Sequence, residues 1–133
     1  MGFDTAGQVP PQRDVNLWHL PEVLAVEVHH IRFKRPRRYT VQGKDNEVSE
    51  AVEITIETSE PFLIRALNPA LFVGDIALTA TEGEGDRRYR FLAFQPDDLK
   101  PGEAISIAWN SPGAPRKATG FAYQPPAQRG EER

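Results

Sequence analysis

The chain has 133 residues, no cysteine and a formal net charge of −3 at neutral pH. This length predicts one domain that can bury its own core, and the lack of cysteine excludes disulfides and thiolate-bound metals. The net charge is too small to steer ligands over a long range, so local clusters of charge matter more.

Both ends of the chain are rich in Gly, Pro and Gln and carry few residues to bury. We therefore predict flexible tails over residues 1–14 and 124–133, with one domain over residues 15–123. No apolar run reaches the roughly 18 residues that a membrane span needs. Residues 1–13 lack the basic and apolar regions of a signal peptide, so we expect a soluble, cytoplasmic product without a membrane partner.

The first predicted strand spans Glu22–Phe33 and begins with an apolar face of period two. That face consists of Leu24, Val26 and Val28. Ile31 and Phe33 then follow at an odd step, so we predict a β-bulge at His29–His30 that returns them to the same face.

Pro36 should end this first strand or place it at a sheet edge, and residues 39–42 form a short strand before a polar turn. Ala51–Thr58 alternates well, so its apolar residues should face the core and its polar residues the solvent. The inward set is Val52, Ile54 and Ile56, and the outward set is Glu53, Thr55 and Glu57.

Prolines divide the next part of the chain. We predict a strand over Phe62–Leu67, with a helical turn as the alternative because Phe62, Ala66 and Ala70 are four residues apart. Pro69 favours the strand, since it would interrupt a helix. Strands over Leu71–Val73 and Ile76–Thr79 follow on either side of Gly74.

Residues 87–109 read as two strands around a turn rich in Pro, Asp and Gly. The inward residues of the pair are Tyr89, Phe91 and Ala93, then Ile105, Ile107 and Trp109. A last strand over Ala118–Tyr123 should direct Phe121 and Tyr123 inward. Seven to eight short strands without a long helix predict an all-β, antiparallel β-sandwich, with Ile54, Phe91 and Ile107 meeting in its core.

The run from Pro69 to Trp109 resembles the second half of an immunoglobulin-like domain of the IPT/TIG, or early-set, type. The matching pieces are FVGDIALT, YRFLAFQP and LKPGEAISIAW, which begin at Phe72, Tyr89 and Leu99. The tyrosine corner of fibronectin type III domains is missing, because Ile105 stands at its position. The resemblance implies an immunoglobulin-like β-sandwich used for binding or as a spacer, and it carries over no catalytic residues.

A basic segment at residues 32–38 is the strongest local signal. It could bind an anion or a nucleic acid, because clustered cations neutralise phosphates. It could equally be a charged edge strand that resists pairing with other chains, an interpretation that the acidic net charge favours. The candidate patch, with a second basic run that could extend it, consists of Arg32, Lys34, Arg35, Arg37, Arg38, Arg87, Arg88 and Arg90.

Other candidate sites favour structural interpretations. His29 and His30 are adjacent on a strand and His19 is not at ligand spacing from them, so we expect no metal site. Glu53 and Glu57 should lie about 13 Å apart on the strand, which is too wide for a glycosidase pair. No hydrolase elbow, Walker loop or zinc-protease motif occurs, so we predict no catalytic residues, no cofactor and no enzymatic activity.

Two tryptophans are large for so small a domain. We expect Trp109 in the core, and Trp18 either covering one end of the sandwich or exposed as a docking anchor. The sequence thus predicts a non-catalytic interaction or scaffold module with protein partners. Anion or nucleic-acid binding through residues 32–38 is the alternative, and an uncovered strand edge would also allow two copies to pair.

Overall fold

The computed structural model describes residues 19–41, 43–62, 68–126 and 131–132. Nearly all regular structure in these ranges is β, with one short 3-10 helix, η1. The elements are β1 (Val23–Val41), β2 (Lys44–Thr58), β3 (Pro69–Val73), β4 (Ile76–Ala77), β5 (Thr79–Glu84), β6 (Arg88–Ala93), η1 (Pro96–Asp98), β7 (Ala104–Trp109), β8 (Lys117–Ala122) and β9 (Glu131–Glu132).

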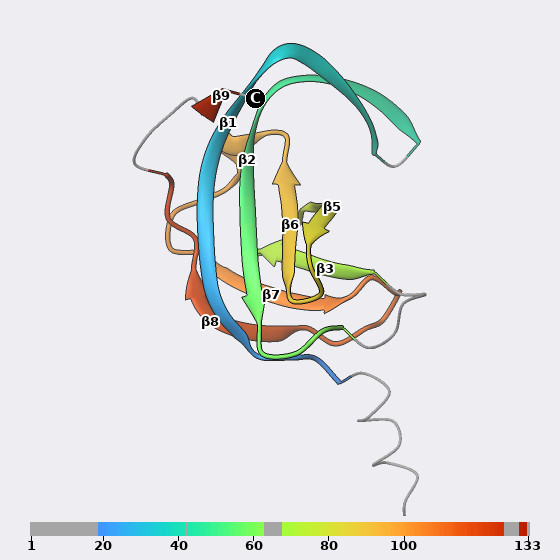
Figure 1. The fold of residues 1–133 in the computed structure, drawn as a ribbon, viewed down its shortest axis with the longest axis vertical. Coiled ribbons are helices and arrows are strands. Elements are labelled where there is room, and N and C mark those ends of the chain that lie inside the picture. The colour runs from blue at the N-terminus through green and yellow to red at the C-terminus, as the bar shows by residue number, and fades with distance from the viewer. Residues whose placement is uncertain (1–18, 42, 63–67, 127–130, 133) are drawn as a thin grey trace, which may run out of the picture.

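The strands form two sheets that pack face to face, as the sequence predicted for a β-sandwich (Figure 1). One sheet has the order β5-β6-β2-β1-β9 and the other β4-β3-β7-β8. All neighbours are antiparallel except β9, which pairs in parallel with Ile31 and Arg32 of β1. These two β9 residues belong to the range 124–133, which we had predicted to be a tail.

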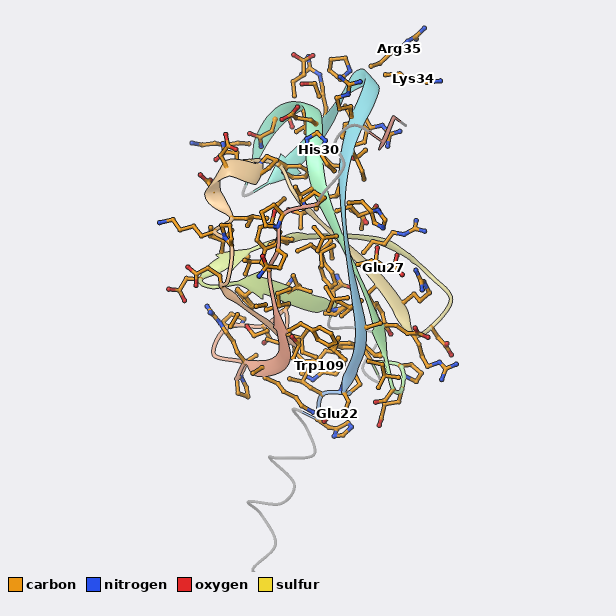
Figure 2. All side chains as sticks on the ribbon, turned by 90° about the vertical axis from the view of Figure 1, so that its left-hand side faces the viewer. Glu22, Glu27, His30, Lys34, Arg35 and Trp109 are labelled. Atoms are coloured by element: carbon orange, nitrogen blue, oxygen red, sulfur yellow. The ribbon has the colours of Figure 1, made fainter. Side chains whose placement is uncertain are left out.

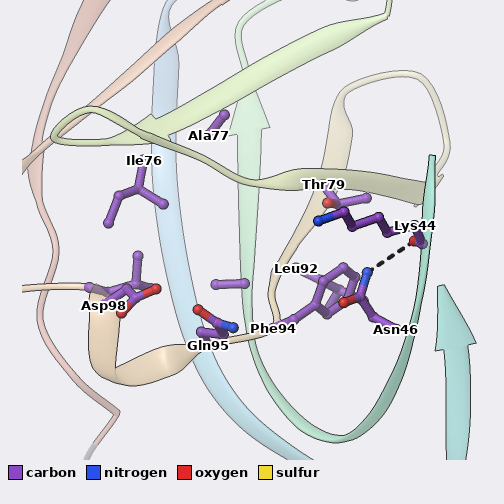
Figure 3. Close-up of a pocket in the computed structure, with 11 residues that line it drawn as sticks. Lys44, Asn46, Ile76, Ala77, Thr79, Leu92, Phe94, Gln95 and Asp98 are labelled. Carbon is purple, nitrogen blue, oxygen red and sulfur yellow. Dashed lines mark hydrogen bonds between the residues drawn. The ribbon is translucent and has the colours of Figure 1, made fainter. Parts of the chain in front are cut away.

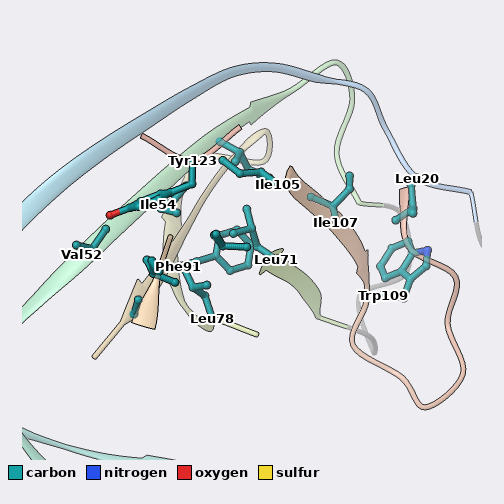
Figure 4. Close-up of a cluster of buried hydrophobic side chains, with 14 residues drawn as sticks. Leu20, Val52, Ile54, Leu71, Leu78, Phe91, Ile105, Ile107, Trp109 and Tyr123 are labelled. Carbon is teal, nitrogen blue, oxygen red and sulfur yellow. The ribbon is translucent and has the colours of Figure 1, made fainter. Parts of the chain in front are cut away.

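The main core lies between the sheets and contains the three residues that we predicted to meet there (Figure 4). Ile54 of β2, Phe91 of β6 and Ile107 of β7 are all essentially inaccessible to solvent. Trp109 closes one end of this core, where its indole nitrogen Nε1 donates to the His19 carbonyl oxygen at 3.1 Å. The Phe62 ring meets the Trp109 ring edge-on, with 4.9 Å between centroids.

The predicted bulge at His29–His30 is wrong. The register of β1 against β2 runs without interruption from Ala25 to Arg32, so His30 and Ile31 lie on opposite faces of the sheet. The apolar residues of β1 change from even to odd positions at Ile31 because a different face of the strand is buried there, and not because of a β-bulge. Pro36 does not end the strand either, because it lies inside a later register shift between Arg32 and Arg37.

A second apolar cluster therefore forms on the outer face of the five-stranded sheet. It consists of Ile31, Phe33, Val48, Ala51 and Leu92, with Tyr39 and Phe94 packed against it. The end of the β1–β2 hairpin supplies three of these residues by bending over the sheet (Figure 1). We call this end, residues 33–41 of β1 and 44–49 of β2, the arm.

Two inward predictions fail for local reasons. Leu24 is 59% exposed because a register shift between Val23 and Ala25 leaves it as the extra residue of a bulge. Phe121 is 37% exposed because β8 shifts register against β7 around Gly120, which has a φ of 85°. Tyr123, beyond this shift, is buried as predicted.

Several predictions fall outside the described residues. These include the tail over residues 1–14, the placement of Trp18, and most of the strand or helical turn over residues 62–67. Of that last segment only Phe62 is described, and its backbone N–H donates to the Tyr89 hydroxyl at 3.0 Å.

We expect Ile54→Ala to lower the free energy of unfolding by about 2–5 kcal/mol, because it leaves a cavity between the sheets. The exposed Leu24→Ala is the control and should change this free energy by less than about 0.5 kcal/mol. Urea unfolding of both variants measures the difference, and equal losses would contradict the core assignment.

Candidate functional site

The basic segment forms the outermost part of the arm. Between Arg32, opposite Glu50, and Arg37, opposite Val48, four residues of β1 face the single residue Ser49 of β2. The extra residues make a bend, and Figure 2 shows Lys34 and Arg35 at its outer end, directed away from the sandwich. We call residues 32–38 the basic bend.

The structure divides the predicted cationic patch into three groups. Arg32, Lys34, Arg35 and Arg38 are exposed on the basic bend. Arg37 and Arg90 line a cleft beneath the arm, and the Arg37 side chain is also exposed to solvent.

Arg87 and Arg88 lie toward the far end of the sheet, next to Thr58 and Glu57 of β2. Seven or eight strand residues, or roughly 25 Å, separate them from the level of Arg32. The Arg88 guanidinium also lies 3.9 Å from the Glu27 carboxylate. These two arginines therefore do not extend the basic bend.

The cleft beneath the arm, the arm cleft, has a volume of about 180 Å³. Its walls come from the outer face of the sheet and from the arm: Ile31, Phe33, Arg37, Tyr39, Glu53, Thr81, Arg90 and Leu92. The Arg37 guanidinium carbon lies 4.4 Å from the centroid of the Phe33 ring, which is a cation–π contact. Tyr39 stacks on Phe94 with 4.7 Å between centroids, so aromatic contacts hold the arm against the body.

Glu53 is the functional candidate that sequence reasoning missed. We expected it in solvent on the outer face of β2, yet it is only 6% exposed, and Thr55 beside it is buried too. The sequence did contain a signal, because Ile31 and Leu92 lie on the same outer face as Glu53. Large apolar residues on an outer face indicate that another segment of the protein covers that face. The sequence did not show that the arm provides this cover.

A second cleft, of about 340 Å³, opens where η1 and the segment after β8 meet the sheets. Its lining includes His30, Glu50 and Tyr123. His30 is 7% exposed, and its Nε2 atom lies 3.8 Å from the Glu50 carboxylate. Burial raises the pKa of the Tyr123 phenol above its usual value of 10.

His29 and His30 are adjacent in β1 and lie on opposite faces of the sheet, whereas His19 lies beside Trp109 at one end of the core. Nε2 of His19 lies 3.2 Å from the Glu60 carboxylate, and Nε2 of His29 lies 3.3 Å from that of Glu27. Within the described residues, no group of three or more His, Asp or Glu side chains is arranged to hold a metal ion.

A third cleft, of about 360 Å³, lies between the end of the arm and the edge formed by β4 and β5 (Figure 3). Lys44 and Asn46 of the arm face Ile76, Thr79 and Asp98 across it. The Asn46 side chain donates to the Lys44 carbonyl oxygen at 3.1 Å, which fixes one wall. Its lining mixes apolar and polar side chains, and its charged residues are Lys44 and Asp98.

No family model, curated protein or solved structure matches this chain. In the part of the chain that the structure describes, no helix has the length and apolar character required to cross a bilayer. The cytoplasmic location expected from the sequence stays a prediction.

We expect Tyr39→Ala to loosen the arm, because it removes the stack on Phe94 and a contact with Phe33. An aromatic pair contributes roughly 1 kcal/mol beyond the area it buries, so arm amides should exchange hydrogen several times faster while β7 amides do not change. Arg38→Ala, one residue away, is the control. Equal exchange in the two variants would show that the arm is not held by this ring.

Tyr123 should give the protein an alkaline pH dependence. The phenol of the unfolded chain ionises near pH 10, whereas the folded protein retains the proton to higher pH. The stabilisation is therefore complete below about pH 10 and is lost as the pH rises through the folded pKa. Urea unfolding between pH 8 and 11 should show a steeper loss for the wild type than for Tyr123→Phe, and parallel curves would contradict this.

Proposed function

We propose that this protein is a non-catalytic interaction module in which the sandwich is the scaffold and the basic bend contacts an acidic surface of a partner protein. The observation that carries the proposal is the exposed charge of Lys34 and Arg35 at the tip of the bend. Within the described residues, no carboxylate lies within ion-pair distance of Lys34 or Arg35, although both are exposed at the end of the molecule.

Three cations elsewhere on the protein, Arg88, Arg116 and Lys117, lie beside a carboxylate. Lys117 pairs with Glu22, and the Arg116 guanidinium lies 3.2 Å from the Asp75 carboxylate while also stacking on Phe72. An unpaired, projecting cation has its full hydrogen-bonding capacity for a partner carboxylate. This contrast supports a contact role for the bend over a role in stabilising the fold.

The structure also supports an immunoglobulin-like scaffold as part of this proposal. With β9 set aside, the orders β1-β2-β6-β5 and β4-β3-β7-β8 resemble the A-B-E-D and C–F–G sheets of immunoglobulin-like domains. The FVGD piece forms the β3–β4 turn, where Gly74 adopts a φ of 58°. In this fold class, binding through projecting loops and hairpins on a rigid scaffold is common.

Nucleic-acid binding is the alternative, and the arm geometry favours the acidic protein over it. Aromatic rings near a basic segment can stack on bases, but Phe33 is only 8% exposed and Tyr39 is stacked on Phe94. Only phosphate contacts would remain for the bend. The net charge of −3 further opposes a long polyanion.

A salt titration tests the proposed function. The wild-type protein should bind a poly-glutamate peptide more tightly than a single-stranded oligonucleotide of equal charge, with affinity that falls as salt rises. Lys34→Glu/Arg35→Glu should abolish this binding. Arg87→Glu/Lys100→Glu, with the same change in charge elsewhere on the surface, is the matched control.

Three results would contradict the proposal. They are an absence of poly-glutamate binding at low salt, equal losses in the two double variants, and tighter binding of the oligonucleotide. The last result would establish the alternative function.

A further inference from the structure

We propose that the arm cleft binds a small zwitterion, an α-amino acid, with Arg37 and Arg90 holding its carboxylate and Glu53 accepting hydrogen bonds from its ammonium group. This site lies on the inner side of the arm, it does not include Lys34 or Arg35, and it does not depend on the proposed function. It goes beyond that function because it assigns a small-molecule ligand to the inner side of the arm.

The size of the arm cleft limits the ligand. Its volume of about 180 Å³ equals the share of roughly six water molecules in the liquid. Sites for drug-sized ligands are about 300–1,000 Å³, so the cleft would enclose only a small part of a nucleotide or a peptide segment. A single amino acid is of suitable size.

The charges in the lining match a ligand with both signs. Arg37 comes from the arm, Arg90 from β6 and Glu53 from β2 between them, and all three line the same cleft. Guanidinium groups bind carboxylates through two parallel hydrogen bonds. A purely anionic ligand would be repelled by Glu53, whereas the ammonium of an amino acid would meet it.

The interactions that Glu53 and Arg90 make within the protein leave hydrogen-bonding positions for a ligand. Glu53 and Arg90 already have interactions within the protein. A carboxylate has about four acceptor positions and a guanidinium five donors, so each group can bind a ligand while retaining a protein partner. Burial of Glu53 among such groups also explains how its charge is tolerated on the outer face of the sheet.

The remaining walls would hold an apolar side chain. Ile31 and Leu92 form the floor and belong to the second apolar cluster, together with Phe33. The cation–π contact with Phe33 positions the Arg37 guanidinium before any ligand arrives. A pre-positioned group loses less conformational freedom on binding, which favours affinity for a small ligand.

Calorimetric titration with three matched probes tests the proposal: L-valine, 3-methylbutanoate, which lacks the amine, and 2-methylpropan-1-amine, which lacks the carboxylate. L-Valine should bind saturably, and each partial analogue at least about tenfold more weakly, because each analogue can form only one of the two charge-assisted contacts proposed for L-valine. Equal affinity for 3-methylbutanoate would overturn the zwitterion assignment. So would an absence of saturable binding by L-valine and by every other standard L-amino acid.

Variants of adjacent arm residues test the site itself. Arg37→Gln should weaken binding of L-valine at least about tenfold, whereas Arg38→Gln, the neighbouring exposed residue, should leave it unchanged. Arg37→Lys should fall between the two, because it keeps the charge but loses the forked geometry. Hydrogen exchange of the arm amides verifies that each variant keeps its fold, and equal affinities for Arg37→Gln and Arg38→Gln would overturn the site.

The double variant Lys34→Glu/Arg35→Glu distinguishes this proposal from the proposed function. It should lose poly-glutamate binding and retain L-valine binding. Loss of L-valine binding in that variant, with the arm amides still protected, would place the amino acid on the basic bend and overturn the assignment to the arm cleft.

Discussion

Burial of β2 on both faces is the constraint on which the rest of the structure depends. Its inward residues Val52, Ile54 and Ile56 pack between the sheets, and its outward residue Ala51 packs with Ile31 and Leu92. Full burial of one large apolar side chain contributes about 1.5–3 kcal/mol, so an uncovered outer face would forgo several such contributions. The β1–β2 hairpin provides the cover itself, by extending past the sandwich and bending back over it (Figure 1).

That bend determines where the charges lie. Phe33 and Tyr39 must both face the body to complete the second apolar cluster, and a regular strand cannot curve so sharply between them. The four residues opposite Ser49 absorb the curvature, as bulges do, and they carry Lys34, Arg35 and Pro36 outward. Arg37 remains exposed but also lines the arm cleft, so one short sequence supplies an exposed basic surface and one wall of a cleft.

The main core could be predicted from the sequence because alternation within a strand reports one buried face. Ile54, Phe91, Ile107 and Trp109 followed that rule and lie where the pattern placed them. The arm could not be predicted from the sequence. A strand that buries one face in its first segment and the other face in its second segment has the same apolar pattern as a strand with a β-bulge between the two segments. His30 and Ile31 are the point at which that ambiguity arose, and the buried position of Glu53 follows from it.

Net charge and local charge act over different ranges in this protein. At physiological ionic strength the Debye length is about 8 Å, so a partner approaching the end of the arm meets Lys34 and Arg35 before it meets the acidic remainder of the chain. Two projecting cations match a compact acidic patch better than a continuous polyanion, which would extend along the sandwich toward Glu27 and Glu57. Glu50 and Glu47 lie nearer, opposite Arg32 and Arg38 on β2, which leaves Lys34 and Arg35 as the cations that an approaching partner would meet first.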